Sequence, residues 1–256
     1  GREPFPAATK NVCNLASLYP QYFQVVVLAN AGVNTIKDLK GKSIAVQTRG
    51  NTAEIVTQDI LKANGLGYGD MKVNFQASYT DAVSLMKDGH AQVFTLGTTI
   101  PASSVMDLAA GRDMKLLDLA DSLPAMKKIN PGYTLVKIKA NTYAKQDKDV
   151  NVIGYATHLI VSCKLPEDRV YTMLKSMHEG MKDLAAVTKA VEGVSPKEMA
   201  EDMMRVALLS GATVRAVPGD RVLLQGPSGS GKSTLFRTLA GIWPYARGKV
   251  VRSADT

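Results

Sequence analysis

The sequence predicts an α/β domain built on a largely parallel sheet. From Tyr19 onward, short runs rich in β-branched residues alternate with helical stretches, which is the order typical of strands joined by crossover helices. The chain has 256 residues, of which 45% are hydrophobic and 21% charged, enough to bury one large or two small cores. Its longest apolar runs, such as Val25–Ala29, are strand-sized and too short for a membrane helix.

The individual elements follow from local residue patterns. A strand over Phe23–Ala29 precedes a short helix at Thr35–Leu39, which Gly41 ends. The remaining predictions, in chain order, are a strand at Lys42–Gln47, a helix at Ala53–Asn64, a strand at Val73–Gln76, a helix at Asp81–Lys87, a strand at Ala91–Leu96, and a helix that reaches about Ala110 with Pro101 in its first turn.

Three of these strands run into polar turns that open a helix. The turn at Gly50, Asn51 and Thr52 offers Asn51 or Thr52 as an N-cap, and similar turns carry Ser78 and the stretch from Gly97. Free backbone N–H groups at such a helix start suit a carboxylate or phosphate, but an ordinary capped turn explains the first of these sequences equally well. In a parallel sheet the three turns would converge on one crevice.

The turns contain no pairing of a nucleophile with a base. The three histidines, His90, His158 and His178, are scattered and favour structural or surface roles. The two cysteines, Cys13 and Cys163, are too few for a disulfide framework and have no metal-ligand spacing, so we expect them to be packing residues. This pattern indicates binding rather than catalysis.

Composition changes abruptly near residue 205. Residues 205–256 hold eight basic and two acidic residues, a net charge of +6 out of the total of +8, whereas residues 1–204 are nearly balanced at +2. The basic residues of the tail are not interleaved with aromatic ones, so a nucleic-acid role is disfavoured. We predict two segments of different origin, 1–204 and 205–256, without a flexible linker between them.

Several phrases of the first segment resemble a known family. They are Asn14–Pro20, Ile36–Val46, Gly50–Thr52, Lys87–Phe94 and Leu165–Tyr171, and together they look like a TAXI-type solute-binding protein of TRAP transporters over about residues 5–202. The resemblance implies a periplasmic-binding-protein-like receptor, shortened at its N-terminus, that carries a small organic anion or amino acid to a membrane permease without a cofactor. It implies these ligand-binding residues: Tyr19, Gly50, Asn51, Thr52, Ser78, Gly97, Thr98 and Thr99.

The second segment carries a nucleotide-binding motif. A short strand at Asp220–Gln225 leads into a glycine-rich loop that matches GxxxxGK followed by Ser, and a helix follows it. In such a P-loop the backbone N–H groups wrap phosphates, Lys232 reaches the β and γ oxygens, and Ser233 ligates Mg²⁺. The predicted Mg-ATP site comprises Gly226, Pro227, Ser228, Gly229, Ser230, Gly231, Lys232, Ser233 and Thr234.

Residues around this loop, over about 206–251, resemble the start of an ABC transporter ATPase domain. That family also uses a signature sequence, an acidic strand and a switch histidine after its P-loop, and only eight residues follow Gly248. We therefore expect no ATP hydrolysis by this chain.

Three hypotheses remain open. The chain is a periplasmic solute receptor, or an ATP-binding component of an ABC transporter at the cytoplasmic face of the membrane, or a non-native fusion in which neither activity is intact.

Overall fold

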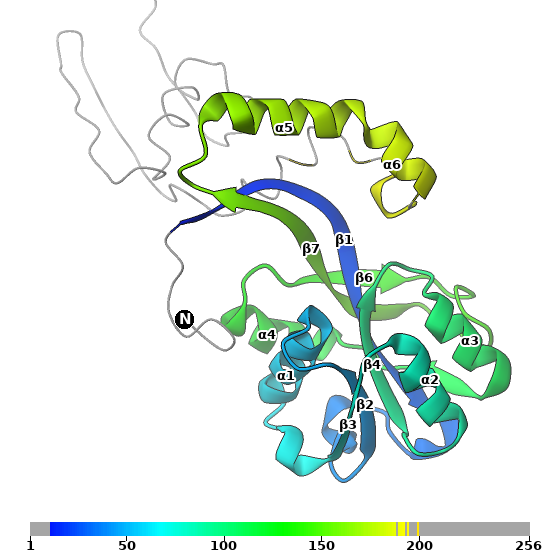
Figure 1. Ribbon diagram of the computed structural model, residues 1–256. Helices are drawn as coiled ribbons and strands as arrows, with labels where there is room; N and C mark the ends of the chain where they lie inside the picture. Colours follow the sequence, from blue (N-terminus) through cyan, green and yellow to red (C-terminus); the bar gives the residue numbers. More distant parts are fainter. Residues whose placement is uncertain (1–10, 188, 193, 195–198, 200–256) are drawn as a thin grey trace, which may run out of the picture. The chain divides into compact units, whose positions relative to one another are not determined.

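The computed structural model describes residues 11–187, 189–192, 194 and 199, which fall into two compact units. The described part of unit 1 is Tyr19–Thr157, and that of unit 2 comprises residues 11–18, 158–187, 189–192, 194 and 199. Two long strands, β1 (Val12–Leu28) and β7 (Val150–Ser162), pass from one unit into the other (Figure 1). The predicted boundary at 204/205 and the whole P-loop lie outside the described residues.

Unit 1 is organised around a mixed sheet in the order β3-β2-β4-β1-β7-β6, with β5 also paired to β1. The α/β class predicted from the sequence is confirmed, but only β3, β2 and β4 are parallel to one another, whereas β1 is antiparallel to β4 and β6 to β7. A crossover helix joins strands that run parallel, but only short 3-10 turns lie between β1 and β2. Strand β1 is therefore not held parallel to β2 and β4. The remaining strands are β2 (Ser43–Gln47), β3 (Lys72–Gln76), β4 (Val93–Thr98), β5 (Met114–Leu116) and β6 (Thr134–Ile138).

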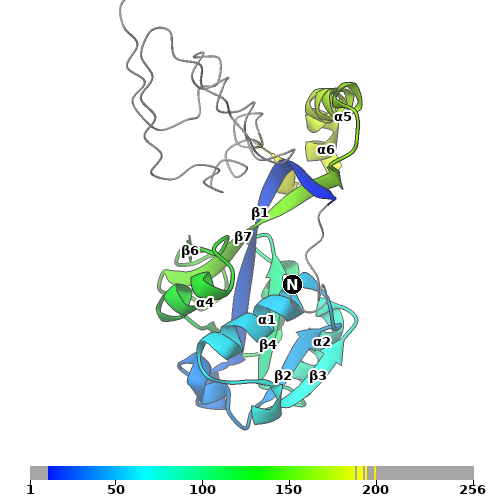
Figure 2. The same cartoon turned by 90° about the vertical axis from the view of Figure 1, so that its left-hand side faces the viewer.

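Four helices cover the two faces of this sheet. They are α1 (Thr52–Ala63), α2 (Tyr79–Lys87), α3 (Ser103–Gly111) and α4 (Leu123–Ile129), and short 3-10 turns lie at Ala29–Ala31, Ile36–Leu39, Tyr68–Asp70 and Ala120–Ser122. Thr57 of α1 bonds Thr95 of β4, whereas Tyr79 of α2 packs on Phe94. Since successive strand residues point to opposite faces, α1 and α2 lie on opposite sides. Helix α4 contacts α1 and α3 contacts α2, and Figure 2 shows α1 crossing over β4.

The helices begin within two residues of their predicted starts: α1 begins one residue and α2 two residues before the predicted position. Of the two predicted candidates Asn51 and Thr52, Asn51 is the N-cap of α1, and Ser78 in the predicted polar turn is the N-cap of α2. The prediction that Pro101 lies in the first turn of a helix is wrong, because it precedes the N-cap residue Ala102. Strand β4 continues to Thr98, two residues beyond its predicted end, and this displaces the helix start toward Ser103.

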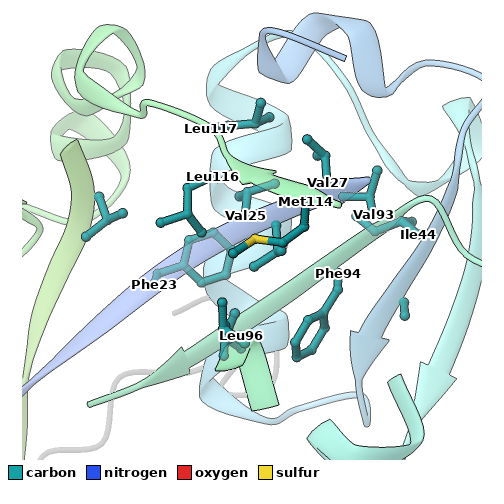
Figure 3. Close-up of a cluster of buried hydrophobic side chains, with 14 of the residues drawn as sticks. Phe23, Val25, Val27, Ile44, Val93, Phe94, Leu96, Met114, Leu116 and Leu117 are labelled. Atoms are coloured by element: carbon teal, nitrogen blue, oxygen red, sulfur yellow. The ribbon is translucent and has the colours of Figure 1, made fainter. Parts of the chain in front are cut away.

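A single apolar cluster stabilises unit 1. Figure 3 shows part of this cluster, with side chains from β1, β2, β4 and β5 packed together. Strands β2 and β4 are buried along nearly their whole length, as expected for strands covered by helices on both faces. The labelled members are Phe23, Val25, Val27, Ile44, Val93, Phe94, Leu96, Met114, Leu116 and Leu117.

The described part of unit 2 includes the outer parts of β1 and β7, helices α5 and α6 and a 3-10 turn. The helices are α5 (Glu167–Glu179) and α6 (Met181–Val187), and the turn is at Lys189–Val191. Cys13 and Cys163 form a disulfide with a Cα–Cα distance of 5.1 Å, so the expectation that they are unpaired packing residues is wrong. The two residues are 150 positions apart and become neighbours only because β1 and β7 are adjacent in the sheet.

Candidate functional site: three turns at the carboxyl end of the parallel strands

Three strand-to-helix turns meet at one end of the sheet in unit 1. Strands β3, β2 and β4 are adjacent and parallel, so the turns that follow them leave from the same edge. The contacts around Gly97 confirm that the three predicted turns converge. Tyr79, the first residue of α2, bonds the Gly97 backbone, and Ala53 in the first turn of α1 lies directly beside it.

Gly97 lies in strand β4, and not in a turn as the sequence predicted. The backbone pairing of β2 with β4 ends at Ala45 and Phe94. Farther along β4, the phenol hydroxyl of Tyr79 forms hydrogen bonds with the backbone of Gly97. The Tyr79 hydroxyl donates to the Gly97 carbonyl over 2.9 Å and accepts from the Gly97 N–H over 3.2 Å. A Cβ at position 97 would collide with the hydroxyl of Tyr155 and lie 3.4 Å from Ala53 Cβ, so only glycine fits.

Two tyrosines therefore flank Gly97 with their hydroxyls half-buried. Tyr155 of β7 donates to the side-chain oxygen of Gln21 over 3.2 Å. Burial raises the pKa of Tyr79 and, more strongly, that of Tyr155, to which the neighbouring Tyr79 also contributes. Both hydroxyls keep their protons at neutral pH and act as hydrogen-bonding groups rather than bases.

The turn before α1 is a capped turn that already holds a negative charge. The Asn51 side chain accepts from the Ala53 N–H over 2.9 Å, and the carboxylate of Glu54 accepts from the Gly50 N–H over 3.1 Å. Glu54 is only 1% exposed and also accepts from Gln58 and Tyr68. Of the two interpretations left open for this sequence, the structure favours the capped turn, because these amides are engaged within the chain.

The turn before α2 has the same design. Ser78 accepts from the Asp81 N–H over 3.1 Å and donates to the Asp81 carboxylate over 2.8 Å. An acidic side chain thus stands at this helix start as well. Ser78 has a capping role in the structure, and the next two residues, Tyr79 and Thr80, face a cavity.

Helix α3 differs, because it begins without a side-chain cap and without an acidic residue in its first turn. A cavity of about 570 Å³ lies between its start and that of α2. Among the described residues of the lining, Asp107 is the one acidic or basic side chain, and it pairs with Lys87 over 2.8 Å. The lining is otherwise rich in hydroxyls and consists of Tyr79, Thr80, Val83, Thr98, Thr99, Pro101, Ala102, Ser103, Ser104 and Asp107.

The predicted ligand residues are thus only partly brought together. Thr98 and Thr99 line the cavity, and Gly97 joins the three turns beside it. Tyr19 lies in β1, three residues before the stretch that pairs with β4, and is absent from the described lining of the cavity, as are Gly50, Asn51, Thr52 and Ser78. Sequence reasoning missed Tyr155, which reaches the site from a strand 58 positions beyond Gly97 and carries no local motif.

The predicted nucleotide site, Gly226–Thr234 with Ser233 as the Mg²⁺ ligand, lies outside the described residues. Within the described part of the chain, no helix is both long and apolar enough to span a membrane.

Comparison with known proteins places these features in a family. The NMT1-like family matches residues 1–215, which is most of the chain. The chain belongs to the NMT1-like family. A second match, to the ABC transporter family, covers residues 209–256 and includes the predicted P-loop. The TAXI subtype suggested by the sequence is finer than these matches and stays a prediction.

Curated relatives and solved structures share only parts of this NMT1-like protein. It is 47% identical over 45 residues, 18% of its length, to ABC transporter D family member 1 of Arabidopsis thaliana, of which it covers 3%. It is 46% identical over 50 residues, 20% of its length, to the cytochrome c biogenesis ATP-binding export protein of Roseobacter denitrificans, of which it covers 24%.

Two solved structures resemble the chain at low identity. The periplasmic aliphatic sulphonate binding protein from Escherichia coli has a TM-score of 0.42 and 14% identity, over 76% of this chain and 55% of that one. A variant of ArgBP from T. maritima has a TM-score of 0.38 and 19% identity, over 71% of this chain and 62% of that one. The NMT1-like chain therefore covers less than two thirds of the length of each of these two relatives and two solved structures.

Proposed function

We propose that the NMT1-like part of this chain is the solute-binding receptor of a transporter, which binds a small organic anion or an amino acid and delivers it to a membrane permease. The observation that carries this proposal is the hydroxyl-lined cavity of about 570 Å³ beside the three converging turns. Its volume lies in the range of sites for small molecules. It combines hydrogen-bonding groups with a carboxyl group, that of Asp107, which is already paired with Lys87.

Within this site, the start of α3 is the place we propose for the anionic group of the solute. The starts of α1 and α2 already face Glu54 and Asp81, whereas α3 has no acid in its first turn. The positive end of its dipole and the hydroxyls of Thr99 and Ser103 suit a carboxylate or a sulfonate. The other predicted ligand residues, Tyr19 and the Gly50–Thr52 turn, stay predictions.

The disulfide supports a periplasmic location for this receptor. Structural disulfides persist in oxidising compartments and are rare in the cytosol. The two cysteines of the chain form such a bond between Cys13 and Cys163. We also propose that the transporter is of the TRAP type and that the receptor is of the TAXI type. This part of the proposal is supported by the sequence resemblance.

A thermal-shift panel of dicarboxylates, amino acids, sulfonates and Mg-ATP tests the receptor proposal. A ligand at 100 times its Kd stabilises the folded protein by about 2.7 kcal/mol, which moves the unfolding midpoint visibly. Thr99→Val should weaken the binding of the active solute about tenfold, because it removes one hydrogen bond to a charged group. Thr172→Val, which deletes an exposed hydroxyl from α5, is the matched control and should leave binding unchanged.

The match to the ABC transporter family favours a second candidate function, the binding of Mg-ATP by Gly226–Thr234 at the cytoplasmic face of the membrane. In that case Mg-ATP shifts the midpoint and Lys232→Ala removes the shift. A shift that persists without Lys232 contradicts a P-loop site. If neither solutes nor Mg-ATP move the midpoint, the third hypothesis, a fusion with neither activity intact, replaces both.

A further inference from the structure

The disulfide of unit 2 lies at the far ends of the two strands that connect the units. Cys13 is the second residue of β1, and Cys163 directly follows the end of β7. The Cys163 N–H donates to the Asn11 carbonyl over 3.3 Å, and the side chains of Ser162 and Asn11 are 3.1 Å apart. Cys163 is exposed and Cys13 half-buried, so a dissolved thiol reagent can reach the bond.

The described part of unit 2 buries few apolar side chains, and these are Leu15, Ala16, Met181, Val191 and Met199. Helix α5, all of which is described, has no buried residue, and Tyr171 on it is 67% exposed. Ile160 in the outer part of β7 is 58% exposed. In contrast, every member of the apolar cluster of unit 1 lies between Phe23 and Ile153.

The constraint that the bond adds is local when unit 1 is folded. Cys13 and Cys163 are 150 positions apart, but unit 1 already holds Gln21 of β1 against Tyr155 of β7. Between that contact and the bond lie seven residues of each strand, 14–20 and 156–162, and within them Ser17 bonds His158 over 3.1 Å. The bond therefore closes a short loop whose residues belong mainly to unit 2.

We propose that Cys13–Cys163 is a redox-sensitive disulfide that keeps the outer ends of β1 and β7 paired. When it is reduced, these ends separate, whereas unit 1 stays folded in both redox states. The proposal is independent of the solute that the cavity binds. In the oxidising step, the thiolate of one cysteine attacks the disulfide of a small-molecule or protein oxidant, forms a mixed disulfide and releases the first sulfur of the oxidant as a thiol. The thiolate of the other cysteine then attacks the mixed disulfide and releases the second sulfur of the oxidant as a thiol, so the two protons of the cysteines and two electrons pass to the oxidant. A dithiol reverses both steps and becomes a disulfide itself.

Hydrogen exchange followed by mass spectrometry tests the proposal on the full chain, with and without dithiothreitol. We expect peptides that cover residues 11–18 and 158–163 to exchange at least tenfold faster after reduction. Peptides that cover residues 23–28 and 93–98, in the core strands of unit 1, should exchange at the same rate in both states. Alkylation under denaturing conditions reports the bond directly, since the chain has only two cysteines: no thiol before reduction and two after it.

The double variant Cys13→Ser/Cys163→Ser is the control. It should show the fast exchange of the reduced protein and no further response to dithiothreitol. The proposal is overturned if reduction leaves residues 158–163 as protected as before, or if the core strands of unit 1 lose protection as well. Two free thiols in protein purified under air would overturn it too. If the double variant fails to fold, reduction of the purified wild-type protein decides the matter alone.

Discussion

The two units of this protein are stabilised by different means. Unit 1 surrounds one apolar cluster in which Phe23, Phe94 and Ile44 are fully or almost fully shielded from solvent. The described part of unit 2 exposes Tyr171, Val187 and Ile160, and a covalent bond joins its two strand ends. The stability of a unit with an apolar core depends on side-chain packing, whereas the stability of a unit joined by a disulfide depends on redox conditions. Core substitutions and reductants should therefore act on different units.

The largest effect should come from a cavity in the core of unit 1. Phe94→Ala removes a fully buried ring that packs edge-on against Tyr79 at a centroid distance of 5.9 Å. Loss of buried area together with the cavity should cost about 3–5 kcal/mol in the free energy of unfolding. Urea titration of the wild type and the variant measures this loss. A cost below about 1 kcal/mol would contradict the assignment of this cluster as the core.

A smaller but more specific effect is expected at Gly97. Gly97→Ala should destabilise unit 1 by about 1–3 kcal/mol, because the new methyl group collides with the Tyr155 hydroxyl in a packed site. Tyr155→Phe in the same chain should recover part of the loss, since it removes the colliding oxygen. A double-mutant cycle in urea checks this. Additive effects would show that the two residues do not touch.

Alkaline pH should weaken unit 1 selectively. The folded state holds the pKa of Tyr155 above its ordinary value mainly through burial, and the same cause acts on Tyr79. Above about pH 10 the unfolded chain has lost these protons while the folded chain retains them, so stability falls as pH rises. Urea midpoints between pH 8 and 11, measured for wild type and Tyr155→Phe, report this. The variant should show the shallower decline, and equal slopes would contradict the prediction.

The smallest effect should come from the exposed face of α5. Tyr171→Ala should change the free energy of unfolding by less than about 0.5 kcal/mol, because this side chain is 67% exposed. The same urea titration gives the value. A loss as large as that of Phe94→Ala would mean that unit 2 depends on apolar packing at this residue, and the contrast between the units would fail.

Local chemistry made much of unit 1 predictable from the sequence. The caps Asn51 and Ser78, the strand runs of β2 and β3 and the polar turns are visible because each depends on neighbouring residues. The parallel order of β3, β2 and β4 follows from the helices between them, and with it the convergence of the three turns.

Features that join residues far apart in the sequence depend on the three-dimensional arrangement of the strands. Sheet order set β1 antiparallel between β4 and β7, which placed Tyr155 against Gly97 and Cys13 against Cys163. Acidic side chains, Glu54 and Asp81, lie at the starts of α1 and α2, and the cavity lies at the start of α3. Such contacts depend on which strands are neighbours and on how far each strand extends, and hydrophobic periodicity records neither of these.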